Sequence, residues 1–280
     1  MSDESPGPPE AQEPSASRVP VSKIDTSVPH SARIWNYWLG GTDNYDVDRA
    51  AGDAYRSAFP GITEIARESR NFLIRSIGYL ARDAGVRQFL DVGTGLPTAD
   101  NTHHIAQRAA PDSRIVYVDN DPLVLLHANA LLTSSREGMT EYIEADLHEP
   151  ERILAAAGEL LDLSRPVALI LSGILGHVPA YEEARGIVRR LMAGLPSGSF
   201  LDINEGVDTD PVYAAAQREY NASGAIPYHL RTMEEIAGYF EGLELVEPGV
   251  VPVTLWRPDV PPYGAPPAPI GQAGGVGRKP

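Results

Sequence analysis

Residues 88–97, QFLDVGTGLP, and residues 114–121, RIVYVDND, decide the fold of this chain. Each stretch begins with a short apolar or β-branched run that is typical of a buried strand, and each ends in acidic and turn-forming residues. The residues between them indicate a helix that ends at Ala110, directly before Pro111. A strand, a helix and a second strand in this order form a right-handed crossover between parallel strands. The two stretches therefore predict an α/β fold with a parallel sheet.

The alternation of strand and helix continues toward the C-terminus. Further strands are predicted within 140–146, 166–173 and 199–205, and helices within 150–162, 182–195 and about 210–240. Residues 243–248, LELVEP, and residues 250–256, VVPVTLW, read as two strands joined by a tight Pro-Gly turn. We therefore expect a mostly parallel, seven-stranded sheet with a C-terminal antiparallel hairpin.

Composition divides the chain into four parts. Residues 1–26 and 259–280 are rich in proline and small or polar residues, and they cannot bury enough apolar surface to offset the entropy of the chain. Both are expected to be disordered tails. Residues 27–86 precede the first strand and are expected to form a helical extension that could act as a lid. Residues 87–258 are expected to hold the α/β domain.

The overall composition excludes several classes of function. The 280 residues include 23 basic and 38 acidic side chains, for a formal net charge of −15, which repels nucleic acid and anionic membrane surfaces. No apolar run approaches the roughly 18 residues of a membrane span. The N-terminus lacks the features of a secretory signal, so we expect a cytoplasmic location. The chain has no cysteine, which rules out disulfides and thiolate chemistry, and it has no metal-ligand spacing such as HExxH, so no metal is expected.

Acidic residues follow three successive predicted strands. Asp91 opens the loop Asp91-Val92-Gly93-Thr94-Gly95, while Asp119 and Asp146 end the second and third strands, and Ser172 ends the fourth. The carboxyl ends of parallel strands share one edge of the sheet, where ligands bind in such folds. Each acid alone could instead cap a helix or a turn. Their joint occurrence beside a glycine loop predicts a nucleotide-type cofactor site.

The glycine loop favours S-adenosylmethionine (SAM) over NAD. A dinucleotide fingerprint requires a third glycine, but Thr98 stands at that position and Pro97 lacks a backbone N–H. SAM carries no phosphate, so its site can dispense with that glycine. Asp91 could orient the loop and reach the amino acid end of SAM, and Asp119 could accept hydrogen bonds from the ribose hydroxyls.

Three long motifs give the chain a family resemblance. They are QFLDVGTGLPT (88–98), VYVDNDP (116–122) and ARIWNYWLGGTDNY (32–45). With these motifs, residues 25–259 resemble the bacterial S-adenosyl methyltransferase family, formerly a domain of unknown function. The resemblance implies a Rossmann-like SAM-methyltransferase fold but no particular acceptor.

The resemblance also implies cofactor contacts by position. Gly93, Thr94 and Gly95 would line the methionine part of SAM, and Asp119 the ribose. On the adenine, Asn120 would cover one face, Asp146 would accept from the amino group, and Leu147 would offer a backbone N–H. Members of the family often carry two histidines after the fourth strand, where this chain has Leu175-Gly176-His177.

An aromatic segment precedes the first strand. Residues 35–45 contain Trp35, Tyr37, Trp38 and Tyr45, and their spacing predicts an amphipathic helix docked on the core. The same rings could form a lid over the pocket, with Gly40-Gly41 as a hinge and an aromatic face against the sulfonium.

His177 is the candidate catalytic residue, because it follows the fourth strand at the usual edge of an acceptor pocket. It could act as a general base or have a structural or substrate-contact role. We predict a SAM-dependent methyltransferase that acts on a small molecule at oxygen or nitrogen. A SAM-binding regulator without catalysis and an NAD-linked oxidoreductase are the alternatives. The sequence does not assign an oligomeric state.

Overall fold

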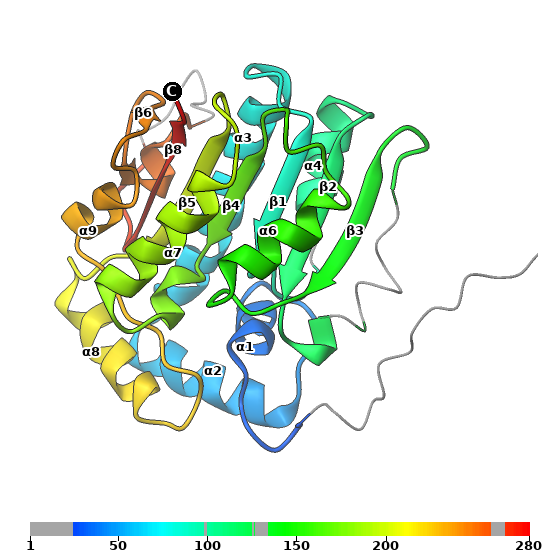
Figure 1. Ribbon diagram of the computed structural model, residues 1–280. Helices are drawn as coiled ribbons and strands as arrows, with labels where there is room; N and C mark the ends of the chain where they lie inside the picture. The colour runs from blue at the N-terminus through cyan, green and yellow to red at the C-terminus, as the bar shows by residue number, and fades with distance from the viewer. Residues whose placement is uncertain (1–24, 98–99, 125, 127–133, 259–266) are drawn as a thin grey trace, which may run out of the picture.

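The structure is a computed structural model that describes residues 25–97, 100–124, 126, 134–258 and 267–280. It contains one eight-stranded sheet in the order β3-β2-β1-β4-β5-β8-β6, with β7 also paired to β8 (Figure 1). Strands β1 to β5 are parallel, and β8 is antiparallel to β5, β6 and β7. The strands are β1 (Gln88–Val92), β2 (Arg114–Asp119), β3 (Met139–Glu144), β4 (Ala168–Ser172), β5 (Phe200–Gly206), β6 (Glu244–Leu245), β7 (Val251–Pro252) and β8 (Gln272–Arg278).

Helices cover both faces of the sheet, as the predicted α/β fold requires. Helices α6 (Pro150–Gly158) and α7 (Tyr181–Ala193) lie on one face, and α3 (Ile62–Arg82) and α4 (Thr102–Ala109) lie on the other. Alternate residues of each strand point to opposite faces. On β1, for example, Leu90 packs on the side of α6 and α7, whereas Phe89 packs on the side of α3 and α4.

The N-terminal extension is helical and lies at the carboxyl ends of the parallel strands. Helices α1 (Ser31–Trp38) and α2 (Asp46–Ala58) sit below these strand ends in Figure 1. A buried ion pair joins the two helices, since Arg33 Nε lies 3.0 Å from Asp48 Oδ2. A cluster of aromatic and aliphatic side chains then connects α1 and α2 to α3 and to α8 (Pro211–Asn221). The extension is thus packed on the domain rather than separate from it.

The predicted C-terminal tail is wrong over residues 272–278. These residues form β8, a buried strand that lies between β5 and β6 and pairs with β5 from Gln272↔Gly206 to Arg278↔Phe200. Its glycines permit close packing: a Cβ on Gly274 would lie 2.5 Å from the carbonyl oxygen of Ile203. The glycine content that suggested flexibility is therefore a packing requirement. Residues 259–266 and the predicted tail over residues 1–24 lie outside the described residues.

The predicted hairpin is also corrected. Strands β6 and β7 do not pair with each other, because each pairs with β8. The sheet has eight strands rather than seven, because β8 is an additional strand. The remaining described helical elements are α9 (Met233–Gly238), η2 (Leu175–His177) and η3 (Val253–Leu255). No helix in the described part of the chain is long and apolar enough to cross a bilayer.

Candidate functional site

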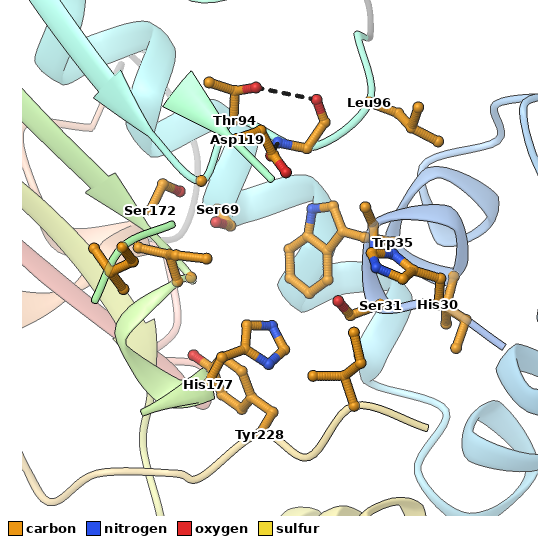
Figure 2. Close-up of a pocket in the computed structure, with 18 of the residues that line it drawn as sticks. His30, Ser31, Trp35, Ser69, Thr94, Leu96, Asp119, Ser172, His177 and Tyr228 are labelled. Carbon is orange, nitrogen blue, oxygen red and sulfur yellow. Dashed lines mark hydrogen bonds between the residues drawn. The ribbon is translucent and has the colours of Figure 1, made fainter. Parts of the chain in front are cut away.

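A cavity of about 340 Å³ opens between the carboxyl ends of β1, β2 and β4 and helix α1. This volume falls in the range of about 300–1,000 Å³ that is typical of small-molecule sites. Twelve of the fourteen residues predicted for the site line it. They are Trp35, Trp38, Asp91, Gly93, Thr94, Gly95, Asp119, Asn120, Asp146, Leu147, Ser172 and His177. Figure 2 labels Trp35, Thr94, Asp119, Ser172 and His177 among them.

The glycine loop after β1 turns sharply at two positions. Gly93 and Gly95 have φ angles of +76° and +63°, a left-handed conformation that favours glycine. A Cβ on Gly93 would lie 2.4 Å from Ile174 Cγ1, so this glycine is needed for packing. A Cβ on Gly95 would meet only Ala32 Cβ at 4.0 Å. Gly95 therefore faces open space in the cavity.

Asp119 fixes the glycine loop from the neighbouring strand. Its Oδ2 accepts a hydrogen bond from the Gly95 backbone N–H at 2.9 Å, and its Oδ1 accepts one from the Asp121 N–H at 3.0 Å. Burial raises the pKa of Asp119, while these hydrogen bonds oppose the rise. Each carboxylate oxygen has a second lone pair, so Asp119 can also accept from a ligand.

Asp91 is buried beside the start of α4. Its Oδ2 accepts a hydrogen bond from Thr102 Oγ1 at 2.6 Å, and burial raises its pKa to about 6. The guanidinium of Arg70, on α3, faces the same end of the cavity and interacts electrostatically with Asp91. Sequence reasoning missed Arg70 because it lies on a helix 18 residues before β1 begins. Its position beside Ser69 and Leu73, on the buried side of an amphipathic helix, was the available signal.

Asn120 and Asp146 meet at the other end of the strand edge. Asn120 Nδ2 donates to Asp146 Oδ2 at 3.2 Å, and His148 Nδ1 lies 2.6 Å from Asp146 Oδ1. Burial by itself would raise the pKa of Asp146, but hydrogen bonds from His148 and Asn120 bring it below its usual value. Asp146 is thus an anionic acceptor at the cavity wall.

Three residues that line the cavity, Ser69, Ser172 and Gln272, are linked through the buried amide of Asn204. Asn204 Oδ1, on β5, accepts from Ser69 Oγ at 2.8 Å and from Gln272 Nε2 at 2.7 Å. Asn204 Nδ2 donates to Ser172 Oγ at 2.8 Å. Gln272 belongs to β8, so the strand that the sequence reading missed also contributes to the site.

His177 enters the cavity from the short helix η2, directly after β4. Its Nδ1 lies 2.8 Å from the carbonyl oxygen of Pro227, which fixes the proton on Nδ1 and leaves a lone pair on Nε2. Burial lowers the pKa of His177, so the imidazole is neutral at pH 7. The ring packs edge-on against Tyr228, with centroids 5.2 Å apart.

Glu205 holds the turn that carries His177. Its Oε1 accepts from the Leu175 N–H at 2.8 Å, and its Oε2 accepts from the Gly176 N–H at 3.2 Å and from the Tyr228 hydroxyl. Burial raises the pKa of Glu205 to about 7. The Glu205 carboxylate therefore holds η2 and Tyr228 together.

Two of the predicted lid aromatics do not reach the cavity. Trp35 and Trp38 line it, but Tyr37 donates to Asp53 Oδ1 at 2.8 Å and Tyr45 lies on the surface under Arg33. The reason is helical geometry: Tyr37 lies on the face of α1 opposite the cavity, and Tyr45 is the N-cap residue that precedes α2. No cluster of metal-ligating side chains occurs among the described residues.

A model of the S-adenosyl methyltransferase family matches residues 17–280. This chain belongs to that family. A DUF574 family protein from Streptomyces avermitilis MA-4680 is 46% identical, with a TM-score of 0.86 over 94% of this chain and 100% of its own. A candidate methyltransferase from Thermobifida fusca YX is 39% identical, with a TM-score of 0.82 over 93% of this chain and 98% of its own. No curated protein matches the chain.

Family membership confirms the predicted fold, enzyme class and cofactor. This S-adenosyl methyltransferase family member is a SAM-dependent methyltransferase. The NAD-linked alternative is set aside.

Proposed function

We propose that this enzyme transfers the methyl group of SAM to an oxygen or nitrogen atom of a small molecule, with His177 as the general base. The observation that carries the proposal is that the residues at the strand ends and His177 line one continuous cavity. When bound, SAM supplies a methyl group that is attached to a positively charged sulfur. Loss of the methyl group converts that sulfur to a neutral thioether.

The side chains at the sheet edge suit SAM in charge and shape. Arg70 would pair with the methionine carboxylate, since a guanidinium presents several donors to a carboxylate. The open space at Gly95 would leave room for the methionine part of SAM. Asp119 would accept from the ribose, and Asp146 from the adenine amino group with Asn120 beside it. The carboxylates are separated along the edge, which matches a ligand with donors at several points.

His177 would act on the acceptor rather than on SAM. Its Nδ1 donates to the Pro227 carbonyl, so Nε2 can receive a proton from an acceptor hydroxyl or amine. Low-polarity surroundings keep the imidazole neutral and ready to accept. Trp35 lies between this residue and the strand-end side chains in Figure 2, so it would contact both ligands.

The test is incubation with methyl-labelled SAM and a fractionated metabolite extract. We expect one labelled small-molecule product and, by calorimetry, binding of S-adenosylhomocysteine. Binding without any labelled product would favour a SAM-binding regulator instead. Absence of binding at millimolar concentration would refute the cofactor assignments.

A further inference from the structure

Beyond the strand ends, the cavity extends into a part that we call the acceptor chamber. Its wall consists of aromatic and aliphatic side chains from α1, α2, α8 and the segment that follows α8. They are Trp35, Trp38, Tyr55, Tyr220, Ile226 and Tyr228. In Figure 2, His177 and Tyr228 lie across the cavity from Thr94 and Asp119. The chamber is therefore the place for a second ligand beside the cofactor.

The wall of the chamber is a connected set of rings. Centroids are 5.9 Å apart for Trp35 and Trp38, 5.1 Å for Trp38 and Tyr55, and 5.6 Å for Tyr55 and Tyr220. All three pairs are edge-to-face, with interplanar angles of 67°, 63° and 67°. Edge-to-face packing holds each ring in place, so the chamber presents rigid ring surfaces. Such surfaces favour a flat aromatic ligand.

Formal charge is confined to the other end of the cavity. Among the described lining residues, the Arg, Asp and Glu side chains are Arg70, Asp91, Asp119 and Asp146, all at the cofactor end. A charged acceptor would lose its hydration in the chamber without gaining an ionic partner, which is costly. A cationic acceptor would also meet the positive sulfur of SAM, a like charge. The chamber therefore favours an uncharged acceptor.

Several polar groups near the chamber already have partners. The Tyr55 hydroxyl donates to Gln217 Oε1 at 2.8 Å, and the Tyr228 hydroxyl donates to Glu205. His177 Nδ1 is held by Pro227. His177 Nε2 is then the acceptor toward which a ligand hydroxyl would turn.

From these features we propose that the methyl acceptor is an uncharged, planar aromatic alcohol, that is, a phenol. The inference rests on the proposed function and specifies its substrate class. The phenol oxygen forms a bond to the methyl carbon as the carbon–sulfur bond breaks, and the phenol proton passes to His177 Nε2. The products are an aryl methyl ether and S-adenosylhomocysteine. Negative charge that develops on the oxygen lies beside the positive sulfur, which favours the transfer.

The test compares three probes that share a naphthalene ring and differ in charge, on the full chain saturated with S-adenosylhomocysteine. The probes are neutral 2-naphthol, anionic 2-naphthoate and cationic 2-naphthylmethylamine, and binding is followed by tryptophan fluorescence and calorimetry. We expect 2-naphthol to bind at least tenfold more tightly than either charged probe. Equal or tighter binding of a charged probe, or no binding of 2-naphthol, would overturn the proposal. Failure of S-adenosylhomocysteine itself to bind would refute the proposed function instead.

A matched pair of variants locates the binding. Ile226 and Val212 are both exposed apolar residues, at 42% and 55%, but only Ile226 lines the cavity. Ile226→Glu should weaken 2-naphthol binding about tenfold or more, whereas Val212→Glu should leave it unchanged. Both positions are at the surface, so both variants should fold. Equal effects of the two substitutions would place the naphthol outside the chamber and overturn the proposal.

Discussion

The Asp119 carboxylate accepts a hydrogen bond from the backbone N–H of Gly95 at 2.9 Å, so the end of β2 holds the glycine loop that follows β1. Two features that the sequence suggested separately, an acid and a glycine loop, are thus one unit. The bond leaves the loop preorganised before a ligand enters. A change at Asp119 should therefore affect both a ligand contact and the shape of the loop.

Asp119→Ala should weaken S-adenosylhomocysteine binding by about 10–150-fold, which corresponds to roughly 1.5–3 kcal/mol for charge-assisted hydrogen bonds. Calorimetry measures the change. Asp112→Ala is the control, because that carboxylate is exposed and pairs with Arg87 away from the cavity. An unchanged dissociation constant for Asp119→Ala would remove Asp119 from the cofactor site.

Gly95→Ala should abolish or strongly weaken S-adenosylhomocysteine binding, because its Cβ would enter the cavity. Gly85→Ala is a matched control: Gly85 has φ +71° with nothing within 4 Å of a Cβ, and it does not line the cavity. Both variants should lose about 1–2 kcal/mol of folding stability from left-handed strain. Only Gly95→Ala should lose binding in calorimetry. If both variants bind as the parent does, the loop is only a structural turn.

His177→Gln should reduce turnover by about 10²–10⁴-fold while S-adenosylhomocysteine affinity stays unchanged. Burial lowers the pKa of His177, so in the parent the base is neutral at pH 7 and becomes protonated at a lower pH than an ordinary histidine. Parent kcat should therefore decrease toward acid pH, and the variant should lack that decrease. A parallel pH profile in parent and variant would show that another group titrates.

Asp202 is a buried carboxyl on β5, and Asp202→Asn should raise the free energy of unfolding above that of the parent at pH 7 and higher. Burial raises the pKa of Asp202 to about 7, whereas the unfolded carboxyl titrates near 4. Between these values the folded state holds a proton that the unfolded state has released, so parent stability falls as pH rises through this window. The free energy of unfolding of the variant, relative to that of the parent, should therefore increase from pH 4 to 7 by at most roughly 4 kcal/mol. A pH-independent difference in urea unfolding would contradict this assignment.

The strand ends could be predicted from the sequence because their signals are local. Apolar runs define the strands, and the parallel arrangement then places Asp91, Asp119 and Asp146 on one edge without further information. The same logic located His177 after β4. These predictions needed only the order of elements along the chain.

Contributions from distant segments could not be predicted in this way. Arg70 reaches the site through the packing of α3 on the sheet, and Gln272 reaches it through β8. The spacing of the N-terminal aromatics indicated a helix but did not decide which face of α1 the cavity would take, so Tyr37 was included wrongly with Trp35. Which helix face and which distant strand reach the cavity depends on tertiary packing.

Gly274→Ala should lower the free energy of unfolding by about 1–3 kcal/mol, the usual cost of overpacking a core. The added Cβ would lie 2.5 Å from the Ile203 carbonyl oxygen, and that oxygen belongs to the paired backbone of β5, so it cannot move aside as a flexible side chain could. Gly186→Ala on α7 is the control, since nothing lies within 4 Å of a Cβ there and alanine favours the helix. In thermal unfolding, Gly274→Ala should have a lower Tm than the parent, and Gly186→Ala should have an equal or higher one. Because Gln272 precedes Gly274 on the same strand and donates to Asn204, the 274 variant should also lose affinity for S-adenosylhomocysteine. A parent-like Tm for Gly274→Ala would mean that residues 272–278 form a mobile tail in solution, as their composition alone suggests, and that β8 is not part of the folded sheet.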